Sequence, residues 1–179
     1  MSELRTNRIV PRDGLASGVS GGIIQVKQSV LTSAAYQNIN AGANYDWSAL
    51  TCAITPTRSD SKILVEFVVN ISSNSTMNRL AAVLTRDGSA ISGAVADSTG
   101  DNKTENTVCI NAPNANEPYM LCGKFLDSPA TTSAVTYGVK IRTGTSSTIT
   151  IYINRQGSES NNIYIMRGTS SITLMEVSG

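Results

Sequence analysis

The chain has 179 residues, enough for one domain with a substantial hydrophobic core and a tail. Its 14 lysines and arginines nearly balance 13 aspartates and glutamates, so the net charge of +1 provides no general attraction to nucleic acid or to an anionic membrane. The absence of histidine excludes Ser-His-Asp and Cys-His catalysis within one chain and removes the most common general base and metal ligand.

Only 15% of the residues are charged, below the roughly 25% of an average soluble domain, and Ser, Thr, Asn and Gly supply most of the polar surface. This bias is typical of β-sandwiches, because Thr favours strands whereas Ser, Asn and Gly favour turns. The sequence has no apolar run long enough for a membrane span, and its first residues do not resemble a secretory signal. We therefore expect no membrane segment and no export.

The three cysteines, Cys52, Cys109 and Cys122, are odd in number and widely spaced, which argues against a disulfide framework and against a zinc site. Each lies in an apolar, strand-like stretch without a histidine to activate its thiol. We expect buried, reduced thiols that pack as small hydrophobic groups, in a protein that folds in a reducing cytoplasm.

Residues 1–22 predict an extended arm, because they combine a proline with a glycine-rich stretch and show no period of a helix or strand. The apolar pair Ile9 and Val10 lies among Arg5, Arg8 and Arg12. We expect this segment to become ordered against a neighbouring subunit, with the arginines pairing to carboxylates there. Nucleic acid is the weaker alternative, since no aromatic residue lies among the arginines for base stacking.

From residue 23 onward, apolar and polar residues alternate with the period of a β-strand, in which successive side chains point to opposite faces. Ile24, Val26 and Val30 share one face of the first strand. A polar connection follows as far as Asn44, and Ala49–Ile54 predicts a short second strand.

The clearest alternation covers Lys62–Ile71. Its odd-numbered residues should face the core, and these are Ile63, Val65, Phe67, Val69 and Ile71. Its even-numbered residues should face outward, and these are Leu64, Glu66, Val68 and Asn70. The alternation continues through Leu80, Ala82 and Leu84. Arg86-Asp87-Gly88 then predicts a hairpin turn in which Gly88 takes a positive φ.

Residues 96–117 predict a long polar loop with a short strand near Cys109. Five further strands are expected after it, at Tyr119–Leu126, Ala134–Arg142, Thr148–Asn154, Ile163–Met166 and Ser171–Val177. Roughly nine short strands at the spacing of a sandwich predict an all-β fold. We expect an antiparallel, jelly-roll-like β-sandwich over residues 23–179, preceded by the arm at 1–22.

Several blocks of the sequence resemble small structural or fibre-like proteins of tailed phages, notably marine and cyanobacterial ones. The blocks are Met1–Leu15, Gly21–Val26, Ile54–Pro56, Ser61–Val65, Phe125–Thr132 and Arg167–Val177. The resemblance implies a virion component with a trimeric head similar to the tumour-necrosis-factor or C1q type of jelly roll. It does not extend to residues 96–117.

Two groups of carboxylates suggest chemistry, and each has a simpler explanation. The loop Asp97–Glu105 offers oxygen ligands for calcium, but its spacing matches no EF-hand and it contains Lys103, so a solvated loop is favoured. Asp13 and Asp87 each lie in an Arg-Asp-Gly sequence and could act on a sugar. Turn formation explains both more simply, because no second carboxylate accompanies either. We expect no catalytic residues, no metal and no cofactor.

Aromatic residues offer a further choice, between a glycan site at a receptor-binding tip and packing in the core or between subunits. The candidates are Trp47, Tyr119, Tyr137, Tyr152 and Tyr164. Packing is favoured, because each tyrosine lies inside a predicted strand.

Taken together, the sequence predicts a non-enzymatic virion structural protein, assembled in the host cytoplasm as a homotrimer. The first hypothesis is a capsid decoration or cement protein whose arms, carrying Arg5, Arg8, Ile9, Val10 and Arg12, lie on the shell. The alternative is a tail-fibre or receptor-binding appendage whose loops bind a host-surface glycan or protein. That role is weakened by the lack of a heptad coiled coil or repeated shaft. An enzyme is disfavoured by the missing histidine.

Overall fold

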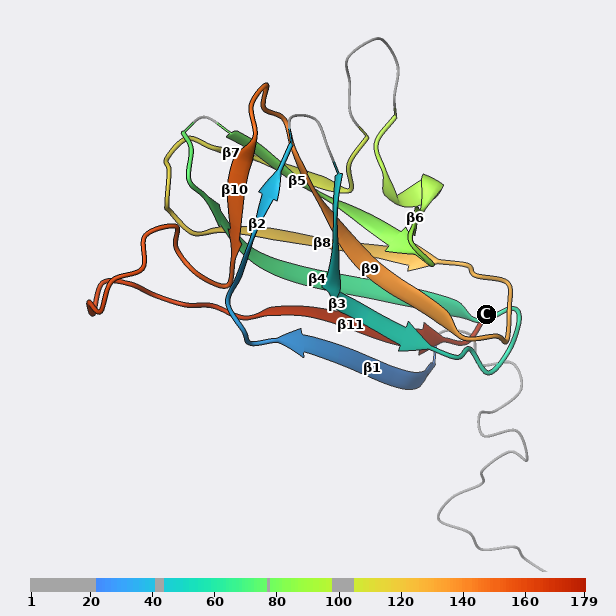
Figure 1. Ribbon diagram of the computed structural model, residues 1–179. Helices are drawn as coiled ribbons and strands as arrows, with labels where there is room; N and C mark the ends of the chain where they lie inside the picture. Colours follow the sequence, from blue (N-terminus) through green and yellow to red (C-terminus); the bar gives the residue numbers. More distant parts are fainter. Residues whose placement is uncertain (1–21, 41–43, 77, 98–104) are drawn as a thin grey trace, which may run out of the picture.

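The computed structural model describes residues 22–40, 44–76, 78–97 and 105–179. Two antiparallel sheets pack face to face as a sandwich (Figure 1). The six-stranded sheet contains β1 (Ile23–Leu31), β2 (Ala35–Ile39), β4 (Lys62–Ser73), β8 (Tyr119–Asp127), β10 (Ile149–Ile153) and β11 (Ser170–Val177). The five-stranded sheet contains β3 (Asn44–Ile54), β5 (Asn78–Arg86), β6 (Ser89–Ala90), β7 (Val108–Ala112) and β9 (Val135–Thr143). A short 3-10 turn, η1 (Ser92–Ala94), follows β6.

The strand order is that of a jelly roll. Along one edge, β4 pairs with β11 over its first part and with β10 over its last residues. In turn, β1 pairs with β11, and β2 pairs with β10. In the same way, β7 and β6 share one side of β5. We treat β1 with β2, β6 with β7, and β10 with β11 as single interrupted strands and number the resulting eight strands in chain order. The two sheets then have the strand orders 1-8-3-6 and 2-7-4-5. The first and last strands, the second and seventh, and so on inward are thus antiparallel neighbours, as in a long hairpin rolled into a sandwich. The predicted jelly-roll-like fold is confirmed.

The core lies between the sheets and follows the predicted alternation. The five inward residues of β4 are buried, from Ile63 to Ile71, and the facing residues of β9 are buried with them, from Val135 to Ile141. The predicted turn is also confirmed, since Asp87 has a φ of 50° and Gly88 a φ of 79°. The Asp87 carboxylate accepts a hydrogen bond from the Thr136 amide at 2.8 Å, which ties this turn to β9.

The structure differs from the sequence-based expectation in three segments. The strand β2 was not predicted, because Tyr36, Gln37 and Asn38 are exposed and resemble a polar connection. It forms because its backbone pairs with β10. Strand β3 begins at Asn44 rather than Ala49. The predicted strand at Ile163–Met166 is wrong: that stretch lies in an irregular loop between β10 and β11, where no neighbouring strand provides backbone partners.

Two buried acidic residues connect separate parts of the sandwich. Asp127, at the end of β8, accepts hydrogen bonds from the Tyr137 hydroxyl and the Arg86 guanidinium, each at 2.7 Å. Because Tyr137 and Arg86 belong to the other sheet, this contact joins the two sheets. Burial, followed by the hydrogen bond to Asp127, raises the pKa of Tyr137 far above its usual range, so its hydroxyl remains a donor.

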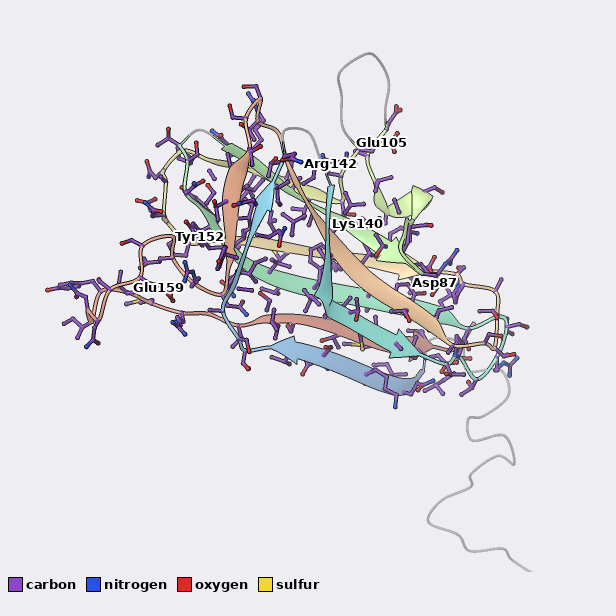
Figure 2. All side chains as sticks on the ribbon, in the orientation of Figure 1. Asp87, Glu105, Lys140, Arg142, Tyr152 and Glu159 are labelled. Atoms are coloured by element: carbon purple, nitrogen blue, oxygen red, sulfur yellow. The ribbon has the colours of Figure 1, made fainter. Side chains whose placement is uncertain are left out.

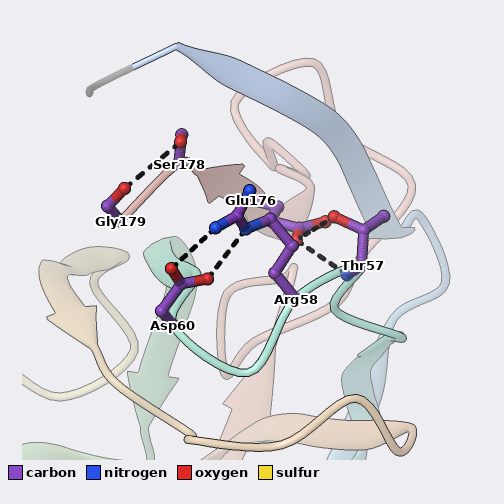
Figure 3. A network of polar contacts seen from close by, with 6 residues as sticks. All are labelled: Thr57, Arg58, Asp60, Glu176, Ser178 and Gly179. Carbon is purple, nitrogen blue, oxygen red and sulfur yellow. Dashed lines mark hydrogen bonds and ion pairs between the residues drawn. The ribbon is translucent and has the colours of Figure 1, made fainter. Parts of the chain in front are cut away.

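The second is Glu176, an inward-facing residue of β11 that is fully buried (Figure 3). Its carboxylate accepts hydrogen bonds from the Gln25 amide at 2.6 Å and from the Thr57 amide and hydroxyl at 2.8 and 2.7 Å. Burial alone would raise the pKa of Glu176, but the hydrogen bonds from Gln25 and Thr57 outweigh burial and lower it. The charged form therefore holds β1 and the β3–β4 connection onto β11. The nearby ion pair between Arg58 and Asp60 lies on the surface.

Candidate subunit interface

The outer face of the six-stranded sheet carries apolar residues in register across four strands. Val26 of β1 lies opposite Met175 of β11, Met175 lies opposite Leu64 of β4, and Leu64 lies opposite Leu126 of β8. Directly opposed residues of antiparallel strands share a face, so these four side chains form one row. Val26 is 53% exposed and Leu126 47% exposed, so water reaches both ends of the row.

A second apolar row lies four residues along the strands. It contains Val30, Val68 and Cys122, with one polar residue, Ser171, between Val30 and Val68. Met120 lies on the same face two residues along β8 from Cys122 and is 56% exposed. The row between the two is polar and contains Gln28, Thr173, Glu66 and Lys124. Glu66 and Lys124 are directly opposed in register, so the one acidic and one basic residue of this row balance in charge. The face is thus apolar, with a neutral polar strip through its middle.

An antiparallel sheet with one face in water normally presents polar side chains on that face. The outer side of the five-stranded sheet is more polar, because Arg79, Lys140 and Arg142 lie on it, beside the buried Ala81 and Val83. Figure 2 shows Lys140 and Arg142 along β9, with Arg142 close to Glu105, whose carbonyl accepts a hydrogen bond from the Arg142 guanidinium at 2.9 Å. The two outer faces therefore differ in chemistry, and contiguous exposed apolar surface marks the six-stranded sheet as the candidate interface.

The strand β8 adds a second kind of contact to this surface. It pairs with β4 on one side, and within the part of the chain that the structure describes no strand pairs with its other side. An open strand edge presents backbone donors and acceptors to a partner. Because Leu126 and Met120 lie on the same strand, the edge and the apolar face are adjacent.

Residues 154–169 form a loop that leaves the sandwich at one end, between β10 and β11 (Figure 1). Its root is fixed by the buried Asn154, which has a φ of 58°. The Asn154 amide nitrogen donates to the carbonyls of Leu31 and Ser33 at 2.8 and 3.0 Å, and its oxygen accepts from the Ser170 hydroxyl at 2.6 Å. One side chain thereby fixes both the break between β1 and β2 and the break between β10 and β11.

The neck of this loop is held by charged and aromatic contacts. Glu159 forms ion pairs with Arg155 and with Arg167. The Arg155 guanidinium lies 4.7 Å from the centre of the Tyr152 ring, a cation–π contact. Figure 2 places Tyr152 and Glu159 on the sandwich side of the loop. These contacts make the neck a defined structure.

The tip of the loop exposes three large apolar side chains. Ile163 is 85% exposed, Tyr164 75% and Met166 71%. Beside them, Ser160, Asn161 and Asn162 line a shallow, polar hollow. The tip is thus the most exposed apolar cluster in the described part of the chain, and sequence reasoning missed it by assigning Ile163–Met166 to a strand.

The structure places the residues singled out from sequence as follows. Arg5, Arg8, Ile9, Val10 and Arg12 of the predicted arm lie outside the described residues, as do Asp13 and most of the Asp97–Glu105 loop. Asp87 has the turn role favoured for it. Among the described residues, no group of three or more acidic or cysteine side chains is arranged to hold a metal ion. No helix in the described ranges is long and apolar enough to cross a membrane.

One expectation about packing is partly wrong. Cys52 is buried, and burial raises the pKa of its thiol, but Cys109 and Cys122 are exposed because they occupy outward positions of β7 and β8. Tyr137 packs in the core as expected, whereas Tyr164 is exposed in the single subunit, so its packing between subunits stays a prediction. The side chain of Trp47 lies outside the described residues.

No protein-family model matches the sequence, and no curated protein matches it. Among solved structures, a chain in the structure of infectious bursal disease virus Gx strain aligns with a TM-score of 0.43 and 10% identity, over 98% of this chain and 45% of that chain. A chain in the structure of the Gt strain aligns with a TM-score of 0.41 and 11% identity, over 94% and 44% of the two chains. This chain spans less than half the length of either. Both neighbours come from virus structures, and the likeness is too distant to assign a function.

Proposed function

We propose that the protein is a non-enzymatic structural component of a tailed-phage virion that assembles as a homotrimer through the outer face of its six-stranded sheet. The observation that carries this proposal is the pair of apolar rows on that face, with Val26, Leu64 and Leu126 among their members. The blocks that resemble small phage structural proteins support the virion role.

The geometry of the face suits a cyclic trimer. A threefold interface joins two different patches of each subunit, whereas a twofold interface joins a patch to its own copy. The apolar face around Leu64 and Val68 provides one patch, and the open edge of β8 with Leu126 and Met120 provides an adjacent, different one. A specific interface of this kind buries on the order of 1,000 Å² or more, which the width of four strands can supply.

Within the virion, we favour the role of a capsid decoration protein. The Ser178 amide donates to the Gly22 carbonyl at 3.0 Å, so the start of the sandwich and the end of β11 lie together. In a cyclic trimer the three arms preceding Gly22 therefore leave from the same end. Arms that bind neighbouring capsomers favour the assembled shell, since any contact made only in the intact state stabilises that state.

The alternative is a tail-fibre or receptor-binding appendage. The specific observation that favours it is the projecting loop with Ile163, Tyr164 and Met166 at its tip, which could contact a host-surface glycan or protein.

Copy number separates the two roles. Quantitative gel densitometry of purified particles should give hundreds of copies for a decoration protein and a few dozen at most for an appendage.

The trimer is tested by sedimentation of the purified protein. Val68→Lys, on the apolar face, should yield folded monomers, whereas Arg79→Glu, a change of two charge units on the other sheet, should leave trimers. A wild-type protein that is monomeric at micromolar concentration contradicts the proposal.

A further inference from the structure

The tip of the 154–169 loop exposes apolar surface that one isolated subunit leaves in water. Ile163, Tyr164 and Met166 lie within four consecutive residues, and each is more than two-thirds exposed. Removing such side chains from water on association is favourable. A clustered set on a soluble protein is therefore a contact surface.

The root of the loop lies on the same face as the proposed interface. Asn70 ends the outward series of β4 and is directly opposed to Met120 of β8. The Asn70 amide donates to the carbonyl of Thr169, where the loop returns to β11. Asn70 and Pro118 also line a shallow depression together with Met166. The apolar surface thus continues from Val68 and Met120 along the loop toward its tip.

The loop is also held in shape before any partner binds. Glu159 pairs with Arg155 and Arg167 from the two sides of the loop, and the Gly168 amide donates to the Asn154 carbonyl at 3.2 Å, which closes the neck. A contact made by a segment that is already ordered loses less conformational entropy on association. This arrangement suits a permanent contact between subunits.

We propose that the tip of this loop packs against a second copy of the chain, so that the three loops of a trimer lie together at one end of the assembly. The occupant is a second copy because the tip is continuous with the face that a second copy covers, and because the loop extends beyond the sheet from its central strands, β10 and β11 (Figure 1). The inference rests on the proposed trimer and adds the loop-tip residues to the contact between its subunits.

Trimer dissociation tests the inference. The combined variant Ile163→Ser, Tyr164→Ser and Met166→Ser should dissociate at a concentration about 100-fold or more above that of the wild type, measured by sedimentation equilibrium. Asn161→Ala, an exposed polar change in the same loop, should leave the dissociation unchanged. Circular dichroism and urea unfolding of the monomers check that the sandwich remains folded.

Cross-linking provides the second readout. With Cys109 and Cys122 replaced by serine, Tyr164→Cys should form disulfide-linked dimers within the trimer under copper-catalysed air oxidation. Ser89→Cys, exposed on the five-stranded sheet, should not. If the triple variant stays trimeric and Tyr164→Cys fails to cross-link while Val68→Lys gives monomers, the loop inference is wrong and the proposed trimer stands. If the triple variant remains a normal trimer but no longer binds host cells, the tip contacts an external partner instead, which also overturns the inference.

Discussion

Replacement of Asn154 tests how the sandwich holds the root of the projecting loop. In Asn154→Ala, the two hydrogen bonds to the carbonyls of Leu31 and Ser33 and the one from Ser170 are lost. Each contributes roughly 1 kcal/mol, and the buried Ser170 hydroxyl proton is left without its acceptor. The φ of 58° adds about 1 kcal/mol, because alanine tolerates the left-handed region less well than asparagine. We expect a loss of about 3 to 4 kcal/mol in the free energy of unfolding.

Two further variants separate these contributions. Asn154→Gly relieves the backbone conformation but loses the same hydrogen bonds, so it should be about 1 kcal/mol more stable than Asn154→Ala, less the entropy that glycine costs. Asn161→Ala, in the same loop and exposed, should change stability by less than about 0.5 kcal/mol. Urea unfolding followed by circular dichroism measures all three. A loss below about 1 kcal/mol for Asn154→Ala would refute the assignment of Asn154 as the residue that fixes both strand breaks.

Three other changes have defined outcomes. Glu176→Gln should destabilise the protein by about 2 kcal/mol at neutral pH, because hydrogen bonds to a charged acceptor become neutral ones. Since the pKa of Glu176 in the folded state is lowered, its contribution to stability is present above the usual pKa of 4.5 and is lost as the pH falls through the folded value. The variant should therefore lose less stability than the wild type on acidification. An identical dependence of stability on acid pH contradicts this. Tyr137→Phe should cost about 1 to 2 kcal/mol in thermal or urea unfolding, because Asp127 keeps its Arg86 contact but loses one donor between the sheets; no measurable change would argue against an inter-sheet role. Deletion of residues 1–22 should abolish particle binding in a co-sedimentation assay while leaving a soluble trimer, and a truncated protein that still coats the particle would remove the arm from the mechanism.

Local alternation predicted those strands whose own residues distinguish two faces. In β4, Phe67 and its inward neighbours differ so clearly from Glu66 and Asn70 that the buried face could be assigned without any partner strand. Strand β2 could not be found in this way, because Gln37 and Asn38 are polar and its stability comes from backbone pairing with β10. The opposite error occurred at Ile163–Met166, where an apolar run satisfies a strand propensity but has no neighbouring strand to pair with.

The candidate interface was only half visible in the sequence. Leu64 and Val68 were assigned outward, and Val26 and Val30 were assigned to a common face, but nothing local says that these belong to one surface. Val26 and Leu126 are a hundred residues apart and come into one row only through the register of β11 and β4. Apolar residues on both faces of β4 were the available signal, because a strand with one face in water has no need of them.

The loop between β10 and β11 begins and ends at a single point of the sheet, where the Gly168 amide meets the Asn154 carbonyl. Because the cost of closing a chain segment rises only slowly with its length, the number of residues between these two positions can change without altering the pairing of either strand. The jelly roll therefore offers a place where a foreign peptide can be inserted, and where related chains are free to diverge in length while every sheet register is kept.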